Sequence, residues 1–347
     1  MSDTVTAPIT VEVTRGDLVE SFHRGLVSVV NAQGEEVCAI GDTSTRVFPR
    51  SAIKVLQALP LVESGAADAL DLDDAELALA CASHNGEDTH VKTARVMLIK
   101  AGLSVEDMEC GSHWPKRMED IAALVRAEEE PSALHNNCSG KHAGFLGLAR
   151  ALGAPTKGYV LPEHPVQQEI KAVIEAFTCE EVTTDVCGTD GCSIPTYAVP
   201  LKAWARAFAI FGTGEGLDED RLAACDKLYE ACVSEPFMVA GTDRFCSDVM
   251  AAFEGRVFVK TGAEGVFCAA IPELELGIAL KAEDGANRAA ESMMGALLEV
   301  LMQDRNDEQS KVLQRYTNPP VLTRRDVTAG EVRPAADFVA DLYAQLS

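Results

Sequence analysis

The stretch FPRSAIKVLQALP, residues 48–60, contains a serine and a lysine whose roles decide how the rest of the chain is interpreted. An extended Phe-Pro leads into a segment whose apolar residues recur at helical spacing, and Pro60 is expected to kink or end that helix. Ser51 and Lys54 are three residues apart and therefore share one helical face. The ordinary interpretation is a helix cap followed by a solvated lysine. The alternative is a nucleophile with its general base beside it.

Two further segments favour the alternative. Ser83-His84-Asn85 follows a helix-like segment, and Lys260-Thr261-Gly262 ends a predicted strand. The order S-x-x-K, S-x-N, K-T-G is the motif set of penicillin-recognising enzymes and serine β-lactamases. The second motif would supply a hydroxyl that relays a proton to the leaving group. The third would supply a cation and a strand-edge N–H that completes an oxyanion hole with that of Ser51. We therefore predict that Ser51 is an acylating nucleophile and Lys54 its base.

Composition narrows the class of protein. A chain of 347 residues with 47% hydrophobic residues can bury a large core. No apolar run reaches the roughly 18–20 residues that span a bilayer, and the first residues lack a basic segment leading into an apolar one, so a cytoplasmic protein is expected. The formal net charge of -24 argues against nucleic acid and anionic membranes as partners. The 11 cysteines are expected to be reduced.

Periodicity predicts a β-hairpin over 22–41 and a mixed organisation after it. Helices are expected over 73–83, 87–102, 117–130, 142–152, 163–177, 201–211, 218–235, 243–253 and 286–303, and strands over 256–260, 265–271 and 276–282. Residues 311–347 are expected to be irregular, with a short helix at the end.

The resulting fold class is α/β (α+β), with an antiparallel sheet flanked by helices and a helical subdomain. The whole chain, 1–347, would form one catalytic unit. Its sheet would be built from about 10–50 and 255–347, with a helical and loop region over about 51–254.

Two polar, glycine-bearing stretches stand apart, HNNCSGKHAG at 135–144 and DVCGTDGCSIP at 185–195. One thiolate from each loop could hold Zn²⁺. Lys141 would be a ligand only if the metal removed its proton, and His142 is the more conventional choice. Buried thiols in tight turns, or a disulfide, remain alternatives. His84 and His90 have no spacing that suits a metal and are expected at the surface.

These segments together resemble a known family. PRSAIKVLQALP, ASHNGE, NNCSGKHAG, CGTDGCSIPTY, AGTDRFCSDVM and VKTGAEGVF are similar to the signature segments of the rhizobial-type (class 3) L-asparaginases, the asparaginase II family, over about residues 10–305. The resemblance implies a serine β-lactamase/penicillin-binding-protein-like fold, a homodimer, and an amidohydrolase that converts L-asparagine to L-aspartate and ammonia.

The resemblance also implies roles for individual residues. The expected catalytic pairs are two serine–lysine tandems, Ser51 with Lys54 and Ser83 with Lys260. One zinc ion per subunit is expected on Cys138, Lys141 and Cys192, while Cys187 falls outside the ligand set. The expected substrate-binding residues are Arg50, Asn85, Asp190 and His142.

Two other functions remain open from the sequence. One is a β-lactam-type serine hydrolase or transpeptidase, which the expected cytoplasmic location disfavours. The other is a non-catalytic metal-binding protein organised around the cysteine loops, in which the serines and lysines would have no shared role.

Overall fold

The structure, a computed structural model, describes residues 7–346 and divides into two compact units. The first, here called the sheet unit, comprises the described residues up to Ala52, Val199–Glu215 and those from Val259 onward. The second, the helical unit, comprises Ile53–Ala198 and Gly216–Phe258. The chain therefore passes from one unit to the other between Ser51 and Lys54.

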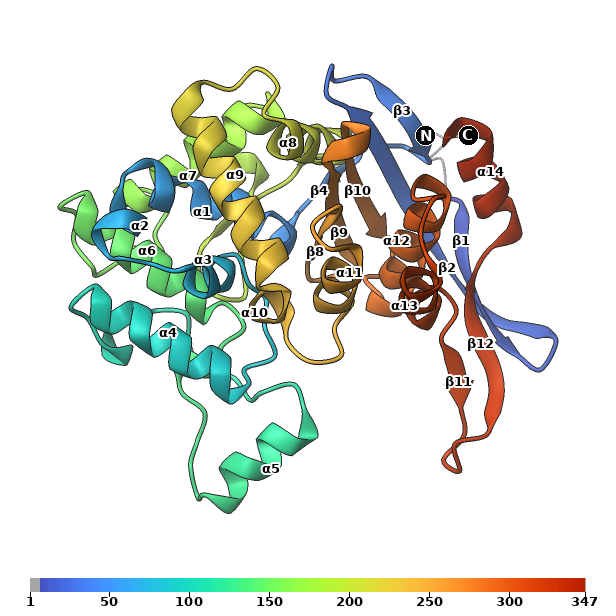
Figure 1. The fold of residues 1–347 in the computed structure, drawn as a ribbon, viewed down its shortest axis with the longest axis horizontal. Coiled ribbons are helices and arrows are strands. Elements are labelled where there is room, and N and C mark those ends of the chain that lie inside the picture. Colours follow the sequence, from blue (N-terminus) through green and yellow to red (C-terminus); the bar gives the residue numbers. More distant parts are fainter. Residues whose placement is uncertain (1–6, 347) are drawn as a thin grey trace. The chain divides into compact units, whose positions relative to one another are not determined.

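The sheet unit is built on an eight-stranded sheet (Figure 1). Its order is β11-β12-β1-β2-β10-β9-β8, with β3 also paired to β2, and each pairing from β11 to β9 is antiparallel. The strands are β1 (Ile9–Arg15), β2 (Leu18–Asn31), β3 (Glu36–Ile40), β8 (Phe258–Thr261), β9 (Val266–Ile271), β10 (Leu276–Ala282), β11 (Pro320–Leu322) and β12 (Thr328–Pro334).

Helices cover both faces of this sheet. They are α8 (Leu201–Thr213), α12 (Asn287–Leu301), α13 (Asp307–Thr317) and α14 (Ala336–Leu346). A Cβ on Gly277 of β10 would meet the Ala205 carbonyl oxygen of α8 at 2.1 Å, so only glycine lets this helix pack so closely. A Cβ on Gly25 of β2 would meet Met293 of α12 at 2.5 Å. Because Gly25 pairs with Ala282, five residues beyond Gly277, α8 and α12 cover opposite faces.

The helical unit packs around α1 (Lys54–Glu63), which is buried from Lys54 to Leu61. Its neighbours include α3 (Asp74–Ala80), α6 (Ser139–Ala151), α7 (Pro165–Thr178) and α9 (Glu219–Ser234). The other elements are α2 (Ala66–Ala69), α4 (Asp88–Lys100), α5 (Met118–Arg126), α10 (Pro236–Ala240), α11 (Phe245–Phe253), and a hairpin of β5 (Cys187–Thr189) and β6 (Pro195–Tyr197).

Short elements complete the two units. In the sheet unit, β4 (Arg46–Val47) pairs with β7 (Val199–Pro200), and a 3₁₀ turn covers Pro272–Leu274. In the helical unit, 3₁₀ turns cover Val105–Asp107, Ala133–His135 and Thr184–Val186. A further 3₁₀ turn, Arg50–Ile53, spans the boundary and leads directly into α1.

The expected fold class, an antiparallel sheet flanked by helices together with a helical part, is confirmed. Of the two outcomes expected at Pro60, a kink or an end of the helix, the second does not occur, because α1 continues to Glu63. The expectation for residues 311–347 is wrong. Residues 311–347 are not largely irregular, since within the described residues they contain most of α13, the strands β11 and β12, and α14.

One further observation concerns membranes. Within residues 7–346, no helix combines the length and apolar character that crossing a bilayer requires.

Candidate active site

The turn that carries Ser51 is held rigidly within the sheet unit. Ahead of it, the Trp204 indole N–H donates to the Val47 carbonyl at 3.0 Å, and the Ala52 N–H donates to the Pro49 carbonyl at 3.1 Å. Arg50 has a φ of 53°, a left-handed conformation that costs energy for a residue with a side chain. Strained backbone residues cluster at active sites and ligand clamps, which makes this turn a candidate, and Ser51 itself is buried.

The K-T-G motif lies against this turn in the same unit. A Cβ on Gly262 would meet the Pro49 carbonyl oxygen at 2.6 Å and the Ala52 nitrogen at 3.2 Å, so the absence of a side chain permits the approach. Lys260, on β8, is fully buried and donates to the Thr261 carbonyl at 3.0 Å. The Gly262 N–H is bonded to the Val266 carbonyl at 2.6 Å, so it is not available as an oxyanion donor.

Lys54, the first residue of α1, is buried in the helical unit. Its Nζ donates to the Ala82 carbonyl and, at 3.3 Å, to the Asn137 carbonyl. These carbonyls belong to the residues directly before Ser83 and Cys138. One ammonium therefore joins the S-x-N loop at 83–85 to the first cysteine loop, residues 135–144. Burial lowers the pKa of Lys54 from its ordinary value, against the opposing effect of Cys138.

Ser83 is held on several sides within the helical unit. Its N–H donates to the Val239 carbonyl at 2.9 Å, and its Oγ accepts from the Asn137 side-chain amide at 3.0 Å. Its carbonyl accepts from Arg244 at 3.4 Å. A serine this firmly positioned is suited to proton transfer.

Asn85, an expected substrate-binding residue, makes extensive bonds to the protein. Its amide nitrogen donates to Glu87 Oε1 at 3.1 Å and to the Thr242 carbonyl at 3.0 Å, and its oxygen accepts from Arg244 at 2.8 Å. Both amide hydrogens are therefore engaged. This arrangement fixes the loop and leaves Asn85 only an acceptor lone pair for a substrate.

The residues expected to hold zinc come together within the helical unit. Cys138 is the N-cap of α6, Lys141 lies in its first turn, and Cys192 lies in the turn between β5 and β6. Lys141 Nζ donates to Cys192 Sγ at 3.1 Å, and all three residues are buried. The thiol of Cys192 bonds to Cys138, which lowers the pKa of Cys138 well below its ordinary value and raises that of Cys192.

This donor set fits zinc. The two cysteine sulfurs are donors that Zn²⁺ prefers, the lysine amine would be an uncommon third ligand, and the three leave room for a fourth. Burial opposes the charge of Lys141, but the neighbouring Cys138 and Cys192 raise its pKa, so a metal would have to displace its proton. Within residues 7–346, no three residues from histidine, cysteine, aspartate and glutamate gather as a metal site, so a site here requires the lysine.

The glycine in this motif has a packing reason. A Cβ on Gly140 would meet the Leu79 carbonyl oxygen of α3 at 2.2 Å. The first turn of α6 can therefore approach α3 only with glycine at this position, and that approach places Cys138 and Lys141.

Two other expected substrate-binding residues border this cluster. The charge of Asp190 contributes to raising the pKa of Lys141. His142 is fully buried, and its Nδ1 bonds to the Tyr159 hydroxyl at 2.8 Å. Its Nε2 has no hydrogen-bond partner among the described residues, and a buried polar atom of this kind marks a place for a ligand or water.

The expectation that His84 and His90 lie at the surface is wrong. Both are fully buried and their rings stack at 4.7 Å. The Gly86 N–H donates to His84 Nδ1 at 3.0 Å, so Nε2 carries the proton and donates to Ser139 Oγ at 2.9 Å. His84 thus connects the S-x-N loop with the first cysteine loop, and burial lowers its pKa well below the ordinary value.

The sequence interpretation missed the residues that fix these loops: Asn137, Arg244 and Glu87. All three lie in signature segments, but their bonds depend on which loops meet in the fold. Glu87 accepts from Asn85, the Thr242 hydroxyl and Arg117, the last two at 2.7 and 2.9 Å.

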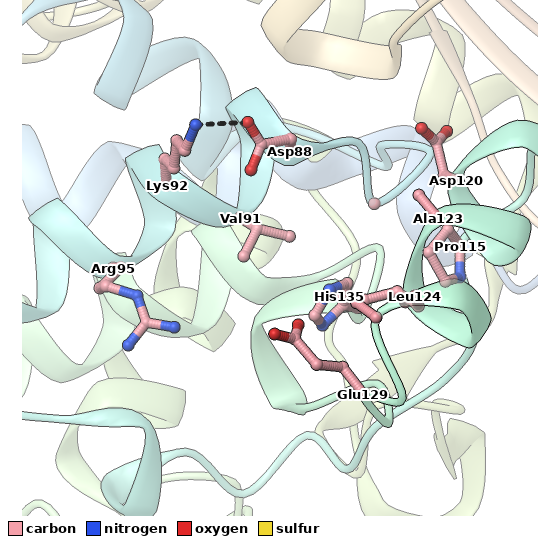
Figure 2. Close-up of a pocket in the computed structure, with 12 residues that line it drawn as sticks. Asp88, Val91, Lys92, Arg95, Pro115, Asp120, Ala123, Leu124, Glu129 and His135 are labelled. Atoms are coloured by element: carbon pink, nitrogen blue, oxygen red, sulfur yellow. Dashed lines mark hydrogen bonds and ion pairs between the residues drawn. The ribbon is translucent and has the colours of Figure 1, made fainter.

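A pocket of about 460 Å³ lies elsewhere in the helical unit (Figure 2). It is bordered by α4, α5 and the 3₁₀ turn at Ala133–His135, and its lining mixes apolar side chains such as Val91 and Leu124 with Arg95 and Glu129. None of the residues predicted to be catalytic or to bind metal or substrate lines it.

Comparisons with solved structures show only distant likeness. A structure of Mglu in its tris and glutamate form matches at 13% identity, over 86% of this chain and 64% of the Mglu chain. A second structure of Mglu matches at 14% identity, over 86% of this chain and 72% of that one. The TM-score is 0.37 for both. A structure from Bacteroides dorei, provisionally described as a beta-lactamase, matches at 14% identity and a TM-score of 0.36, over 75% of this chain and 87% of that one. At these scores the likeness carries no argument about activity.

Sequence comparison is more informative. No curated protein sequence matches the chain. The sequence model of L-asparaginase II, however, matches residues 11–334, nearly the whole chain. The motifs at Ser51, Ser83, Cys138, Cys192 and Lys260 all lie inside the matched region. The chain therefore belongs to the asparaginase II family, as its signature segments indicated.

Proposed function

We propose that this protein is an L-asparaginase that hydrolyses L-asparagine to L-aspartate and ammonia through an acyl-enzyme on Ser51. The observation that carries the proposal is the family match over residues 11–334. The buried Lys54, one turn after Ser51, supports a serine mechanism, because burial favours the neutral amine that a general base requires.

The reaction would proceed in two steps. Lys54 takes the Ser51 proton, and Ser51 Oγ attacks the side-chain amide carbon of asparagine. As the C–N bond breaks, its electron pair stays on nitrogen, which takes the Ser83 proton and departs as ammonia. Lys260 returns a proton to Ser83. Water then attacks the aspartyl ester and gives up a proton to Lys260, while Ser51 Oγ takes back the proton held by Lys54 as the C–O bond breaks and aspartate is released. Two easier displacements replace one difficult displacement.

The substrate is a small zwitterion and requires a cation and an anion to hold it. Arg50, beside Ser51, suits the α-carboxylate as a bidentate donor, and Asp190 suits the α-ammonium group. Glutamine is longer by one methylene, so a clamp on both α-groups would carry its amide carbon out of attack geometry. We therefore propose specificity for asparagine.

Zinc belongs to the same proposal, with one ion per subunit. Cys138, Lys141 and Cys192 would hold it. His142 follows Lys141 in the sequence, and its Nε2, which has no hydrogen-bond partner among the described residues, is a candidate for the fourth ligand or for a bond to it. When bound, the ion would supply positive charge that neutralises the thiolates and joins α6 to the β5–β6 turn. Its proposed role is to order the loops that carry Asn137 and Asp190. The homodimer and the cytoplasmic location remain predictions from the sequence.

A coupled ammonia assay tests the function. Purified protein is offered L-asparagine, L-glutamine and the β-lactam nitrocefin, with Ser51→Ala as the control. The proposal expects ammonia from asparagine, little from glutamine, no nitrocefin hydrolysis, and no ammonia from the variant. Hydrolysis of nitrocefin without ammonia release would support a β-lactam-type hydrolase, and inactivity on all three would favour a non-catalytic role.

A further inference from the structure

We propose that the cavity of about 460 Å³ in the helical unit (Figure 2) is a further ligand site, which binds a free α-amino acid with a large apolar side chain. Its volume lies within the range usual for small-molecule sites, about 300–1,000 Å³. Every residue that lines it belongs to the helical unit. The inference goes beyond the proposed asparaginase activity and does not depend on it.

One wall of the cavity is the helix α5, whose apolar side chains are not fully covered. The structure describes this helix completely and buries none of its residues, although it carries Ile121, Leu124 and Val125. Leu124 and, from α4, Val91 both line the cavity (Figure 2). An amphipathic helix normally buries its apolar face. An apolar side chain of a ligand, placed against Val91 and Leu124, would give α5 the cover that the described part of the chain does not.

The charged side chains of the cavity include a cation and an anion without partners. Lys92 and Asp88 pair with each other at 2.5 Å. Arg95 and Glu129 also line the cavity, and among the described residues neither the guanidinium nor the carboxylate has a hydrogen bond or an ion pair. The third carboxyl, Asp120, is covered at Oδ2, and burial raises its pKa, so Glu129 is the better partner for an ammonium group. One free charge of each sign beside an apolar surface matches a zwitterion with an apolar side chain.

His135 adds a directed hydrogen-bond donor to the cavity. The Ser132 N–H donates to its Nδ1 at 3.0 Å, and burial lowers its pKa, so the ring is neutral and carries its proton on Nε2. This Nε2 has no hydrogen-bond partner among the described residues. The charges of Glu129 and Arg95 both act on the pKa of the ring, so the three groups lie near one another. We therefore assign the carboxylate of the ligand to Arg95 and His135, and its ammonium group to Glu129.

The cavity adjoins the S-x-N loop and the residue pair that follows it, residues 83–87. Gly86 lines the cavity, and because its φ is 79° and a Cβ would meet the His135 carbonyl oxygen at 2.8 Å, only glycine fits here. The Lys116 N–H donates to the Asn85 carbonyl at 2.9 Å, so the segment that leads into α5 is bonded to this loop. A ligand that orders α5 should therefore also slow amide hydrogen exchange in residues 83–87.

Direct binding measurements test the site. L-Phenylalanine is titrated into the purified protein and followed by calorimetry and by tryptophan fluorescence. Trp114, which precedes Pro115 in the lining, should report binding, whereas the other tryptophan, Trp204, is fully buried in the sheet unit. N-Acetyl-L-phenylalanine lacks the ammonium group and L-phenylalaninamide lacks the carboxylate, so each should bind at least about fivefold more weakly.

Single substitutions assign each charge of the ligand to its partner. Arg95→Met keeps the apolar stem and should remove the preference for L-phenylalanine over its amide. Glu129→Gln should remove the preference over the N-acetyl derivative. The matched controls are Arg126→Met and Glu130→Gln, because both side chains are exposed and neither belongs to the lining. The controls should leave all three affinities unchanged.

One further variant distinguishes the cavity from the candidate active site. The proposed clamp of Arg50 and Asp190 would also recognise an α-amino acid, so Arg50→Ala is titrated with L-phenylalanine. Its affinity should equal that of the wild-type protein, since Arg50 does not belong to the lining. Hydrogen exchange with and without L-phenylalanine then locates the ligand, and exchange should slow in residues 113–127 and 83–87.

The outcomes are distinct. Binding that needs both charges of the ligand, fails to discriminate in the two cavity variants and survives in Arg50→Ala supports the proposal. It is overturned if the wild-type protein gives neither heat nor a fluorescence change up to about 10 mM L-phenylalanine. It is also overturned if Arg95→Met and Glu129→Gln behave like their controls, if Arg50→Ala abolishes binding, or if exchange slows only in other segments. None of these readouts requires the protein to release ammonia from asparagine.

Discussion

The sheet unit and the helical unit bury different kinds of side chain. In the sheet unit, β9 is buried throughout and entirely apolar, and β10 is largely so. The buried polar side chains of this unit are mostly hydroxyls, and they also include His23 and the fully buried Lys260. In the helical unit, buried lysines, histidines and cysteines gather around the N-terminus of α6 and bond to one another. Buried polar groups cost stability unless they are paired, so such a concentration is expected where chemistry needs it. The comparison assigns scaffolding mainly to the first unit and most of the positioned polar groups to the second.

The largest effect is expected at Lys54. Lys54→Met keeps the apolar stem and removes the amine that joins the Ser83 and Cys138 loops, so kcat should fall by about 10³-fold or more if Lys54 is the base. The control is Lys92→Met, since Lys92 is exposed and pairs with Asp88 on the same helix. Ammonia release measures both variants. If Lys54→Met turned over asparagine at nearly the wild-type rate, Lys54 would not be the general base.

Two buried serines sharpen the comparison between units. Ser83→Ala in the helical unit should lower kcat/KM on asparagine by about 10²–10³-fold, because the hydroxyl is proposed to supply the leaving-group proton. Ser292→Ala in the sheet unit removes a bond of 2.8 Å to the Thr317 carbonyl, so it should lower Tm and leave kcat/KM intact. Steady-state kinetics and thermal melts of the two variants test this. A similar loss of kcat/KM in both variants would mean that removing any buried serine lowers activity, and that Ser83 has no specific catalytic role.

The proposed substrate clamp consists of Arg50 and Asp190. Arg50→Ala and Asp190→Ala should each lower kcat/KM on asparagine by about 10²-fold, and both should narrow the discrimination against glutamine. An apolar pocket alone would separate the two substrates by only roughly 10–200-fold. Kinetics on both amides measure the effect. Unchanged discrimination in both variants would contradict the clamp.

The smallest effect on turnover is expected from metal loss. Cys138→Ala should abolish zinc binding and lower activity by about tenfold, because the metal's proposed role is to order loops. The matched control in the sheet unit is Cys268→Ala, since Cys268 is fully buried on β9 and should affect stability without affecting zinc. Elemental analysis under reducing, zinc-replete conditions tests the pair. Wild-type protein without zinc would contradict the expected ligand set.

The sequence predicted much of the fold because its strands and helices are strongly patterned. The runs at 265–271 and 276–282 are apolar enough to indicate central strands, and β9 and β10 occupy almost these positions. The strands β11 and β12 were missed because they are half-exposed and carry no alternation; β12 joins the sheet through its pairing with β1, about 320 residues away in sequence, which no local pattern reveals.

The candidate site was predictable to a different degree. Cys138, Lys141 and Cys192 were identified from their loops and resemblance, and they do come together. His84 and His90 were assigned to the surface because a polar loop gave no sign that Phe237 would stack on His90 and Ser139 would bond to His84. Asn137 was missed for the same reason, since its bonds to Ser83 and Lys54 depend on which loops meet in the fold. The expected zinc ligands could be identified from their sequence motifs, whereas hydrogen bonds between loops that are far apart in sequence could be identified only in the folded chain.

The most direct test of the account is the identity of the acylated residue. Wild-type protein is mixed with L-aspartate β-hydroxamate, quenched in acid during turnover, and analysed by intact mass and peptide mapping. The account predicts an added aspartyl group on the peptide that contains Ser51, and none in Ser51→Ala. An aspartyl group on Ser83, or ammonia release from asparagine by the Ser51→Ala variant at the wild-type rate, would contradict it.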